Sequence, residues 1–193
     1  IISNIALTSS SGTFYGIQNA SGAGSNKINI NNNQIQNIAT TTTTGTLHGI
    51  AWTSATQMNI LGNTVNNISR TGAGTTYGIY SGSSSVNENV NSNIISNLIA
   101  TSTTASTLYG IRQNTAAGTK NFKNNQIFSF SGTGGTTMYG IYIGFGTTID
   151  ISGNTIRDLV STGGTSGNVY GINTGTSGTT FNVYKNKLYN LSM

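Results

Sequence analysis

The sequence repeats itself about every thirty residues, and this period constrains the fold more than any other feature of the chain. Each copy contains the pattern apolar-x-apolar-x-x-Asn-x-apolar-x-x-apolar, as in Ile28 to Ile38. The asparagine of the pattern recurs at Asn33, Asn63, Asn93, Asn125, Asn154 and Asn186. Periods of about 20 to 50 residues are typical of solenoids, propellers and other arrays, so we expect a stack of similar units.

A tripeptide ending in Gly-Ile marks each copy a second time. It begins at Tyr15, His48, Tyr77, Tyr109, Tyr139 and Tyr170. The first segment, residues 2–5, matches residues 188–191 near the end of the sequence. The chain therefore holds about six coils of roughly 31 residues and begins and ends at the same phase of the repeat, which suggests a segment of a longer repeat protein.

The spacing of apolar residues predicts strands. Ile149 and Ile151 stand two positions apart, like apolar residues on one face of a strand. No stretch shows the continued spacing of three and four positions that apolar residues have on one face of a helix. Asn, Gly, Ser and Thr separate the short β-branched segments, as turn residues do. Three strands per copy, each stacked on its equivalent in the next coil, would bury every apolar position. Residues 1–193 are therefore predicted to form one all-β domain, a parallel β-helix, and the absence of Asn-Gly and Asp-Gly turns argues against a propeller.

The repeated asparagine has two structural explanations. Buried at a turn, its amide can bond its own turn and the asparagine one coil away, and ladders of this kind stabilise stacked strands. Alternatively, these residues are surface turn formers that tolerate left-handed backbone angles. We favour the buried ladder, because Asn33 and its equivalents are never replaced within the repeat. A looser column at Asn4, Asn37, Asn67, Asn97, Ser129, Asp158 and Asn190 is expected to close the next turn.

The direction of the tyrosines before Gly-Ile stays open. Strict alternation would place Tyr109 and its equivalents in the core together with the following isoleucine. The residue before the tyrosine is also apolar in most copies, as at Leu108, and a bulge at the glycine would then leave the tyrosines outside. His48 takes the tyrosine position in its copy, so it is a member of this column.

Composition excludes several classes of protein. Charged residues make up 6% of the chain, against about 25% in typical soluble domains, but regularly spaced apolar residues (35% overall) argue against disorder. The net charge of +5 comes from scattered cations, so no nucleic-acid footprint is predicted. No cysteine is present for disulfides or thiolate metal sites. No long apolar run predicts membrane insertion, and the sequence shows no signal peptide.

Asn-x-Ile-x-Asn-Ile alternating with Tyr-Gly-Ile resembles the right-handed parallel β-helix repeats of the pectate-lyase-like superfamily. Over nearly the whole chain the sequence looks most like the Asn/Thr/Gly-rich repeat regions of large secreted bacterial surface proteins, such as those of Bacteroidetes. The resemblance implies a right-handed solenoid and an extracellular or cell-surface location. It implies little about activity, because one fold hosts many functions.

Catalytic residues are not predicted. Enzymes that resemble polygalacturonases use clusters of Asp, and the related lyases use Asp or Glu for calcium together with Arg or Lys. This chain contains only Glu88, Asp150 and Asp158, which fall in three different columns. Asp150 and Asp158 are separated by the Asn154 corner, so we expect them to face different ways and to stand in for asparagine. With the single histidine His48, no metal site and no cofactor is predicted.

Binding remains open. Tyr80, Arg112 and Tyr142 follow Gly-Ile directly and share a column, an aromatic–Arg–aromatic strip that would suit sugar rings. A second candidate is an ice-binding row of threonines, at Thr13, Thr46, Thr75, Thr107 and Thr137. Each coil also carries variable loops of Thr, Ser and Gly, which in solenoids often form the binding face.

The leading hypothesis is a non-catalytic structural module of a secreted or cell-surface protein, such as an adhesin shaft, stalk or filament unit. Polysaccharide binding or degradation is the alternative, and ice binding is third. The expected partners are neighbouring β-helix coils or further copies stacked end to end, because neither end shows a charged or Pro-bearing cap. Glycans are a further candidate partner.

Overall fold

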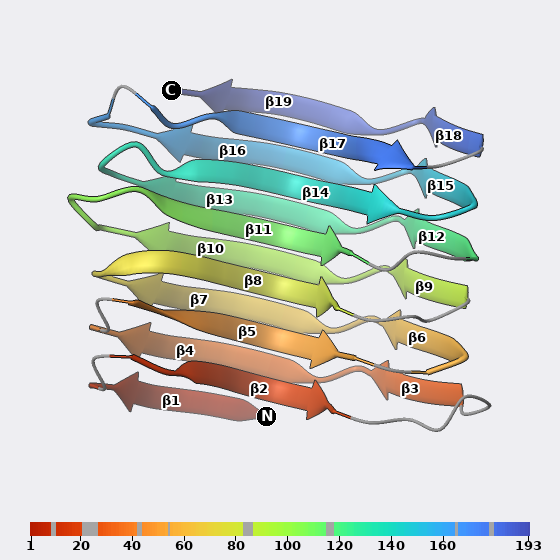
Figure 1. Cartoon of the computed structure of the whole chain (residues 1–193), viewed down its shortest axis with the longest axis horizontal. Coiled ribbons are helices and arrows are strands. Elements are labelled where there is room, and N and C mark those ends of the chain that lie inside the picture. Colours follow the sequence, from red (N-terminus) through yellow and green to blue (C-terminus); the bar gives the residue numbers. More distant parts are fainter. Residues whose placement is uncertain are drawn as a thin grey trace.

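The computed structural model of the chain contains nineteen strands in three parallel sheets (Figure 1). It describes residues 1–8, 11–20, 27–41, 44–53, 55–82, 87–114, 118–164, 166–177 and 180–193, except for the side chains of residues 176 and 177. Sheet A contains β1 (Ile2–Leu7), β4 (Gln34–Thr40), β7 (Thr64–Arg70), β10 (Ile94–Ala100), β13 (Gln126–Gly132), β16 (Thr155–Ser161) and β19 (Lys187–Ser192). Sheet B contains β2 (Thr13–Asn19), β5 (Thr44–Trp52), β8 (Ala73–Ser81), β11 (Ser106–Gln113), β14 (Thr137–Phe145) and β17 (Val169–Ser177). Sheet C contains β3 (Lys27–Asn31), β6 (Gln57–Leu61), β9 (Asn87–Asn91), β12 (Thr119–Lys123), β15 (Thr148–Ser152) and β18 (Thr180–Tyr184).

Each coil visits the sheets in the order B, C, A, and each strand pairs with its equivalents in the adjacent coils. In Figure 1 the sheet B strands in front run to the right, the sheet A strands behind run to the left, and the chain climbs from β1 to β19. This sense of winding is right-handed. The structure confirms the predicted parallel β-solenoid of about six coils, and the described residues include no helix that could span a membrane.

The core is a set of aliphatic and aromatic columns from all three sheets. In the fourth coil, for example, Leu108 and Ile111 from sheet B, Phe122 from sheet C, and Ile127 and Phe130 from sheet A are almost completely buried. Each packs beside its equivalent in the next coil because the strands pair in register. The repeated apolar positions of the sequence are therefore the core positions of the solenoid.

The looser asparagine column has a different role from the one expected. Asn4, Asn37, Asn67, Asn97, Ser129, Asp158 and Asn190 lie within sheet A strands, and do not close a turn. Each has a positive φ, between 53° and 59°. This left-handed residue breaks the alternation of the strand, so that Ile35 and Ile38, three positions apart, are both buried. Asparagine and aspartate suit the position because they tolerate this backbone region better than most residues.

The glycine of Tyr-Gly-Ile settles the direction of the tyrosine column. Leu108 and Ile111 are both buried, whereas Tyr109 between them is partly exposed. A Cβ on Gly110 would lie 2.5 Å from the carbonyl oxygen of Gly140 in the next coil and 2.8 Å from Cγ2 of Ile127. The backbone passes too close to the core there for a side chain, and the residues on both sides of Tyr-Gly turn inward. The tyrosines therefore lie on the outer surface, as the second of the two interpretations proposed.

Candidate functional site

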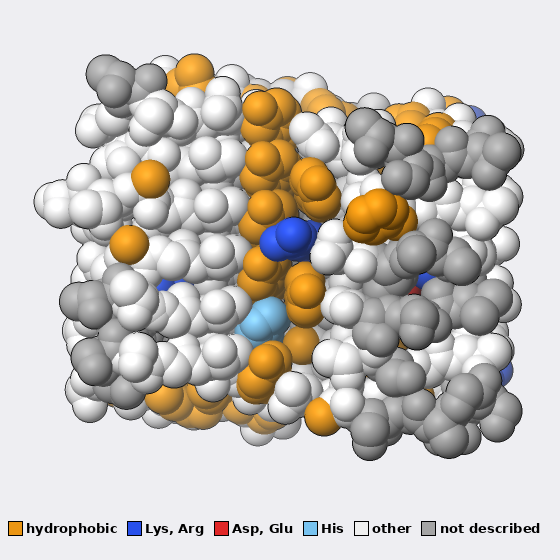
Figure 2. All heavy atoms as spheres, viewed as in Figure 1, with side chains coloured by type: hydrophobic (Ala, Val, Ile, Leu, Met, Phe, Trp, Pro, Cys, Tyr) orange, Lys and Arg blue, Asp and Glu red, His pale blue; other side chains and the backbone are white. Residues whose placement is uncertain are grey.

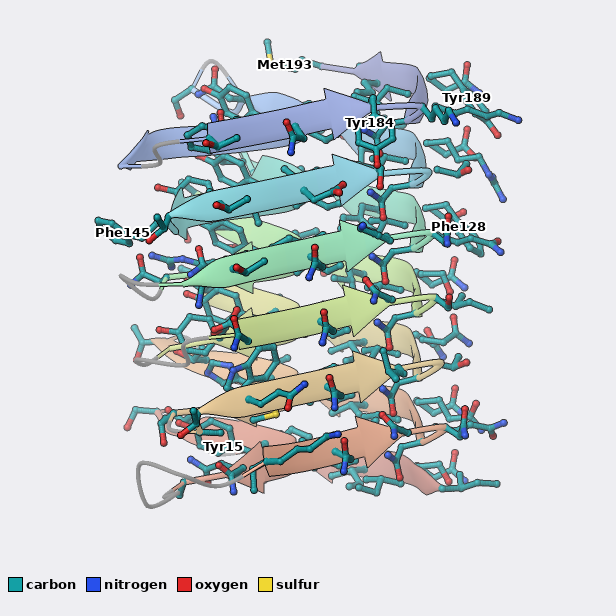
Figure 3. All side chains as sticks on the ribbon, turned by 90° about the vertical axis from the view of Figure 1, so that its right-hand side faces the viewer. Tyr15, Phe128, Phe145, Tyr184, Tyr189 and Met193 are labelled. Atoms are coloured by element: carbon teal, nitrogen blue, oxygen red, sulfur yellow. The ribbon has the colours of Figure 1, made fainter. Side chains whose placement is uncertain are left out.

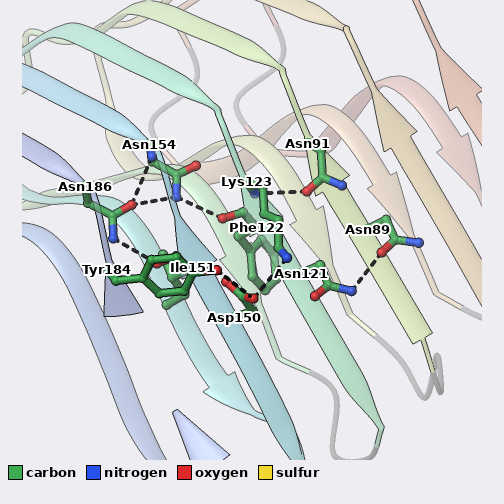
Figure 4. Close-up of polar contacts among 10 residues, drawn as sticks. All are labelled: Asn89, Asn91, Asn121, Phe122, Lys123, Asp150, Ile151, Asn154, Tyr184 and Asn186. Carbon is green, nitrogen blue, oxygen red and sulfur yellow. Dashed lines mark hydrogen bonds and ion pairs between the residues drawn. The ribbon is translucent and has the colours of Figure 1, made fainter. Parts of the chain in front are cut away.

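The predicted asparagine ladder lies at the corner between sheets C and A. The amide oxygen of Asn93 accepts hydrogen bonds from the backbone N–H and the side-chain amide of Asn63, at 2.9 and 3.0 Å. Asn93 in turn donates from the same two groups to the amide oxygen of Asn125 and from Nδ2 to the carbonyl of Ile60. Equivalent bonds join all six coils, from Asn33 to Asn186, and Figure 4 shows the last step. The four central members are fully buried, which confirms the buried ladder.

A second asparagine ladder, which sequence reasoning had not identified, lies on the outer face of sheet C. Asn59 donates to Asn29 at 2.7 Å, Asn89 to Asn59 at 2.8 Å, and Asn121 to Asn89 at 2.9 Å. The next position of this column is Asp150, which pairs in register with Asn121 and whose carboxylate forms an ion pair with Lys123 at 2.9 Å (Figure 4). Burial by itself would raise the pKa of Asp150, but hydrogen bonds from Lys123, Ser152 and Tyr184 together with the charge of Lys123 outweigh it and lower the pKa.

The outer face of sheet B carries the aromatic column. The rings of Tyr15, His48, Tyr77, Tyr109, Tyr139 and Tyr170 stack in order, with centroids 4.7 to 5.1 Å apart and planes within 5° to 21° of each other. Figure 2 shows it as a continuous band along the solenoid, with the pale blue histidine within it. Burial lowers the pKa of His48 to about 4, so its ring is neutral at pH 7.

Beside this column lies the predicted strip of Tyr80, Arg112 and Tyr142. The three residues are adjacent in register on β8, β11 and β14. Tyr80 and Tyr142 are each followed, two residues on, by a glycine: Gly82 directly after the end of β8, and Gly144 within β14. A Cβ on Gly82 would lie only 2.5 Å from Cε1 of Tyr80, so the missing side chain makes room for this ring. The structure thus brings the three predicted binding residues together.

Arg112 is held by aromatic rings on several sides. Its guanidinium carbon lies 5.0 to 5.9 Å from the centroids of Tyr77, Tyr80, Tyr109 and Tyr142, within the range of cation–π interactions. Nη1 donates a 2.8 Å hydrogen bond to the hydroxyl of Tyr77. All three acidic residues lie elsewhere: Glu88 on β9, Asp150 on β15 and Asp158 on β16. The rings thus stabilise this half-buried cation where no carboxylate is at hand.

Burial raises the pKa of Tyr109 to about 12, although the neighbouring Arg112 opposes the shift. The phenols at the centre of the column are therefore protonated over the whole physiological range.

The threonine row lies on the same face of sheet B, two residues before the tyrosine column. Thr46, Thr75, Thr107 and Thr137 are paired in register and partly exposed. The tyrosine column lies beside them on the same face of the sheet. Ice binding by this row stays a prediction.

The carboxylates Asp150 and Asp158 lie on different sheets, as predicted from the corner between them. Asp158 pairs with Arg157 and accepts a 2.8 Å hydrogen bond from Asn190 one coil on. Asn190 and Arg157 stabilise the anion and lower the pKa of Asp158. Neither carboxylate faces the other across a cleft, and in the described part of the chain no three His, Asp or Glu side chains gather into a metal site.

Arg157 is also part of a second aromatic–Arg–aromatic column, on the outer face of sheet A. Phe128, Arg157 and Tyr189 are adjacent in register, and the guanidinium carbon lies 4.3 Å from the Phe128 ring centroid. Phe128 and Tyr189 project from one edge of the molecule in Figure 3.

Glu88 and Lys120 form an ion pair in the interior of the solenoid, which sequence reasoning missed. Lys120 Nζ lies 3.1 Å from Glu88 Oε1, both side chains are fully buried, and the hydroxyl of Ser81 donates to the same oxygen at 2.7 Å. Burial lowers the pKa of Lys120, and the charge of Glu88 opposes the shift. The repeat contained the signal, because the two residues occupy the inward column of Met58 and Ile149, one coil apart.

Arg70 is a further buried cation that sequence reasoning had counted among the scattered ones. It is 1% exposed, and its guanidinium donates to the carbonyl oxygens of Gly45, Gly72 and Thr75. Its role is to donate hydrogen bonds to backbone carbonyl oxygens where the chain passes from sheet A to sheet B.

Of the variable loops, residues 21–26, 42–43, 83–86, 115–117 and 165 lie outside the described residues, so their predicted role as a binding face stays a prediction.

Comparison of the chain with protein-family models, with curated proteins and with solved structures finds no match.

Proposed function

We propose that this chain is a non-catalytic structural module of a secreted or cell-surface bacterial protein, an adhesin shaft, stalk or filament unit. The observation that carries the proposal is the corner ladder, which joins all six coils by side-chain hydrogen bonds without a break. Such a ladder couples every coil to the next along one axis. A linear, regularly braced body is what a spacer between an anchor and a distal domain requires.

The pairing of each carboxylate with a cationic side chain supports this proposal. Glu88 is paired with Lys120 in the interior, Asp150 with Lys123, and Asp158 with Arg157. A glycosidase of this general shape needs two carboxylates about 5 to 10 Å apart across the bound sugar. Here the three acidic groups take part in interactions that brace the coils. The relation to pectate-lyase-like proteins and a bacterial source belong to the same proposal and rest on the sequence resemblance.

The partners that we propose are further coils of the same solenoid or copies stacked end to end. The last coil exposes apolar side chains that point inward in the other coils: Phe181 is 37% exposed, Val183 49% and Leu188 43%. Val183 and Leu188, together with Ile172 and Asn186, line an open depression of about 430 Å³. Another coil would bury this surface and pair the free edges of β17, β18 and β19.

Light scattering of the purified chain tests end-to-end stacking. Concentration-dependent growth into linear assemblies is expected, and a stable monomer at high concentration would count against copies as partners. The cell-surface location is tested separately with an antibody against the chain on intact cells of the source organism. Labelling without permeabilisation is the expected result, and labelling only after permeabilisation would contradict the proposal.

A second candidate function, polysaccharide binding on the outer face of sheet B, is favoured by the Tyr80–Arg112–Tyr142 strip. Two aromatic side chains flank one cation at successive strand spacings of ~4.8 Å, on a face that carries no acidic residue in its described part. Aromatic rings and guanidinium groups are suitable partners for sugar rings and hydroxyls. A glycan array tests it: binding that Arg112→Ala abolishes is expected, and an array without signal would exclude it.

A further inference from the structure

The outer tyrosine column brings several oxidisable phenols into contact at one surface. Tyr77, Tyr109, Tyr139 and Tyr170 form an unbroken run of stacked rings, each one coil after the last. The last two steps are the closest to parallel, with centroids 4.7 and 4.8 Å apart and planes within 5° and 8°. Register pairing holds Tyr139 opposite Tyr170, so the two rings leave the sheet side by side and equivalent atoms of both lie near each other.

We propose that this column is an oxidative cross-linking site, at which a peroxidase and hydrogen peroxide join neighbouring tyrosines into dityrosine. Each phenol gives up one electron and its hydroxyl proton and becomes a phenoxyl radical. The two radicals form one carbon–carbon bond between the ring positions next to the oxygens. The hydrogens at those positions then move to the oxygens and restore both phenols. Hydrogen peroxide takes up the two electrons and two protons and leaves as two molecules of water.

The structure favours one pair within the column. Arg112 donates a hydrogen bond to the hydroxyl of Tyr77 and places its charge over the rings of Tyr77 and Tyr109. A cation over a ring stabilises the electron-rich phenol and disfavours removal of an electron from it. Tyr77 is also only 7% exposed. Tyr139 and Tyr170 are more open and lie outside the cation–π contacts of Arg112, so they are the expected site of coupling.

The stacked geometry, and not exposure alone, is what selects this pair. Tyr184 and Tyr189 are both 46% exposed, more than the tyrosines of the column, yet among the described residues neither ring stacks on another. Two radicals held in contact couple within one molecule at a high effective concentration, whereas isolated ones must meet between molecules. The product would tie the fifth coil to the sixth covalently. This inference depends on ring geometry and not on the proposed role as a shaft.

Peptide mapping tests the inference directly. Trypsin cleaves after Lys123, Arg157 and Lys185, which places Tyr139 and Tyr142 in peptide 124–157 and Tyr170 and Tyr184 in peptide 158–185. In the variant Tyr142→Phe/Tyr184→Phe, a bond between these peptides can join only Tyr139 and Tyr170. The protein is treated at low concentration with a plant peroxidase and one equivalent of hydrogen peroxide. We expect dityrosine fluorescence, a monomer on a denaturing gel, and a linked peptide pair lighter than the sum of both by two hydrogens.

A matched control keeps the ring and removes the phenol. Adding Tyr139→Phe to the same variant preserves the stack and should abolish the linked pair, whereas adding Tyr189→Phe should leave its yield unchanged. The proposal is overturned if the linked pair does not form, if dityrosine arises only between molecules, or if the Tyr189→Phe change removes as much product as the Tyr139→Phe change. Circular dichroism before oxidation confirms that each variant is folded.

Discussion

At the scale of single residues, the corner asparagine is the most demanding position of the repeat. Its oxygen accepts two bonds from the coil before, and its amide donates to the coil after and to a backbone carbonyl. Aspartate lacks the donor, and a serine or alanine side chain is too short to reach both neighbours. This combination of donor and acceptor explains why Asn33 and its five equivalents are identical in sequence.

Replacing Asn93 by alanine tests this role. The change leaves the backbone N–H of Asn63 without its acceptor in the buried corner and removes one acceptor of the Asn63 side-chain amide, which still donates to the carbonyl of Ile30. Each lost partner costs about 1 to 3 kcal/mol. We expect a loss of roughly 3 kcal/mol in the free energy of unfolding, measured by urea denaturation. The control is Gln126→Ala, an exposed residue of β13 that should change stability by less than about 0.5 kcal/mol. Equal effects of both changes would contradict the ladder as a source of stability.

His48 makes stability depend on pH. Its pKa is lowered from 6.5 to about 4 by burial between two tyrosine rings, so the folded state binds fewer protons than the unfolded state between these values. Stability should therefore fall as the pH drops from about 6.5 to 4, by up to ~1.4 kcal/mol per pH unit. Asp150 and Asp158, with lowered pKa values, contribute stability that is lost only below this window.

The variant His48→Tyr isolates this effect, because it completes the tyrosine column and removes the titrating group. Urea denaturation at pH 7 and pH 4.5 should show a smaller loss of stability in the variant than in the parent chain. The same loss in both chains would mean that His48 does not govern this window.

At the scale of elements, β9 and β12 are joined by the interior ion pair of Glu88 and Lys120. Removing one partner of a buried pair leaves an uncompensated charge, whereas replacing both by apolar residues is often neutral or stabilising. The pair is flanked by Met58 and Ile149 in the same column, so an apolar replacement has apolar neighbours. We therefore expect the pair to fix which coil pairs with which, more than to add net stability.

A double-mutant cycle measures this balance. We expect Lys120→Met alone to cost about 3 to 5 kcal/mol, and Glu88→Met/Lys120→Met to lie within about 1 kcal/mol of the parent chain or above it. Thermal and urea denaturation of the parent, the single variants and the double variant provide the comparison. A double variant as unstable as the single one would show that the pair contributes net stability.

At the scale of the whole molecule, the solenoid is nearly one-dimensional, because each coil contacts chiefly its two neighbours. The central coils are covered on both sides, whereas β1, β2 and β3 at one end and β17, β18 and β19 at the other each have one free side. The exposure of the core side chains reflects this difference: Ile60, Ile95 and Ile127 of the central coils are fully buried, whereas Leu188 of β19 is 43% exposed. Stability should therefore be highest in the middle and decrease toward both ends.

Hydrogen exchange followed by mass spectrometry tests this gradient. Amides of β7, β10 and β13 should exchange slowest and those of β1 and β19 fastest, since local opening requires fewer broken contacts at the ends. In linear assemblies of the chain, the end strands should gain protection. Uniform protection along the isolated chain would indicate a single cooperative unit instead of a stack of coupled coils.

The sequence by itself determined the period, the strand-rich coils, the core columns and the corner ladder, because each of these is a repeated local pattern. Only the tertiary structure decided that Tyr109 lies outside, that Asn37 bends a strand and does not end it, and that Glu88 meets Lys120 in the interior. In the first two cases a glycine or a left-handed residue breaks the alternation of side chains, so local spacing no longer predicts direction. In the third case, the charges of Glu88 and Lys120 compensate each other only after two coils are stacked in register. The contacts of Arg112 with four tyrosine rings depend on the same stacking of coils.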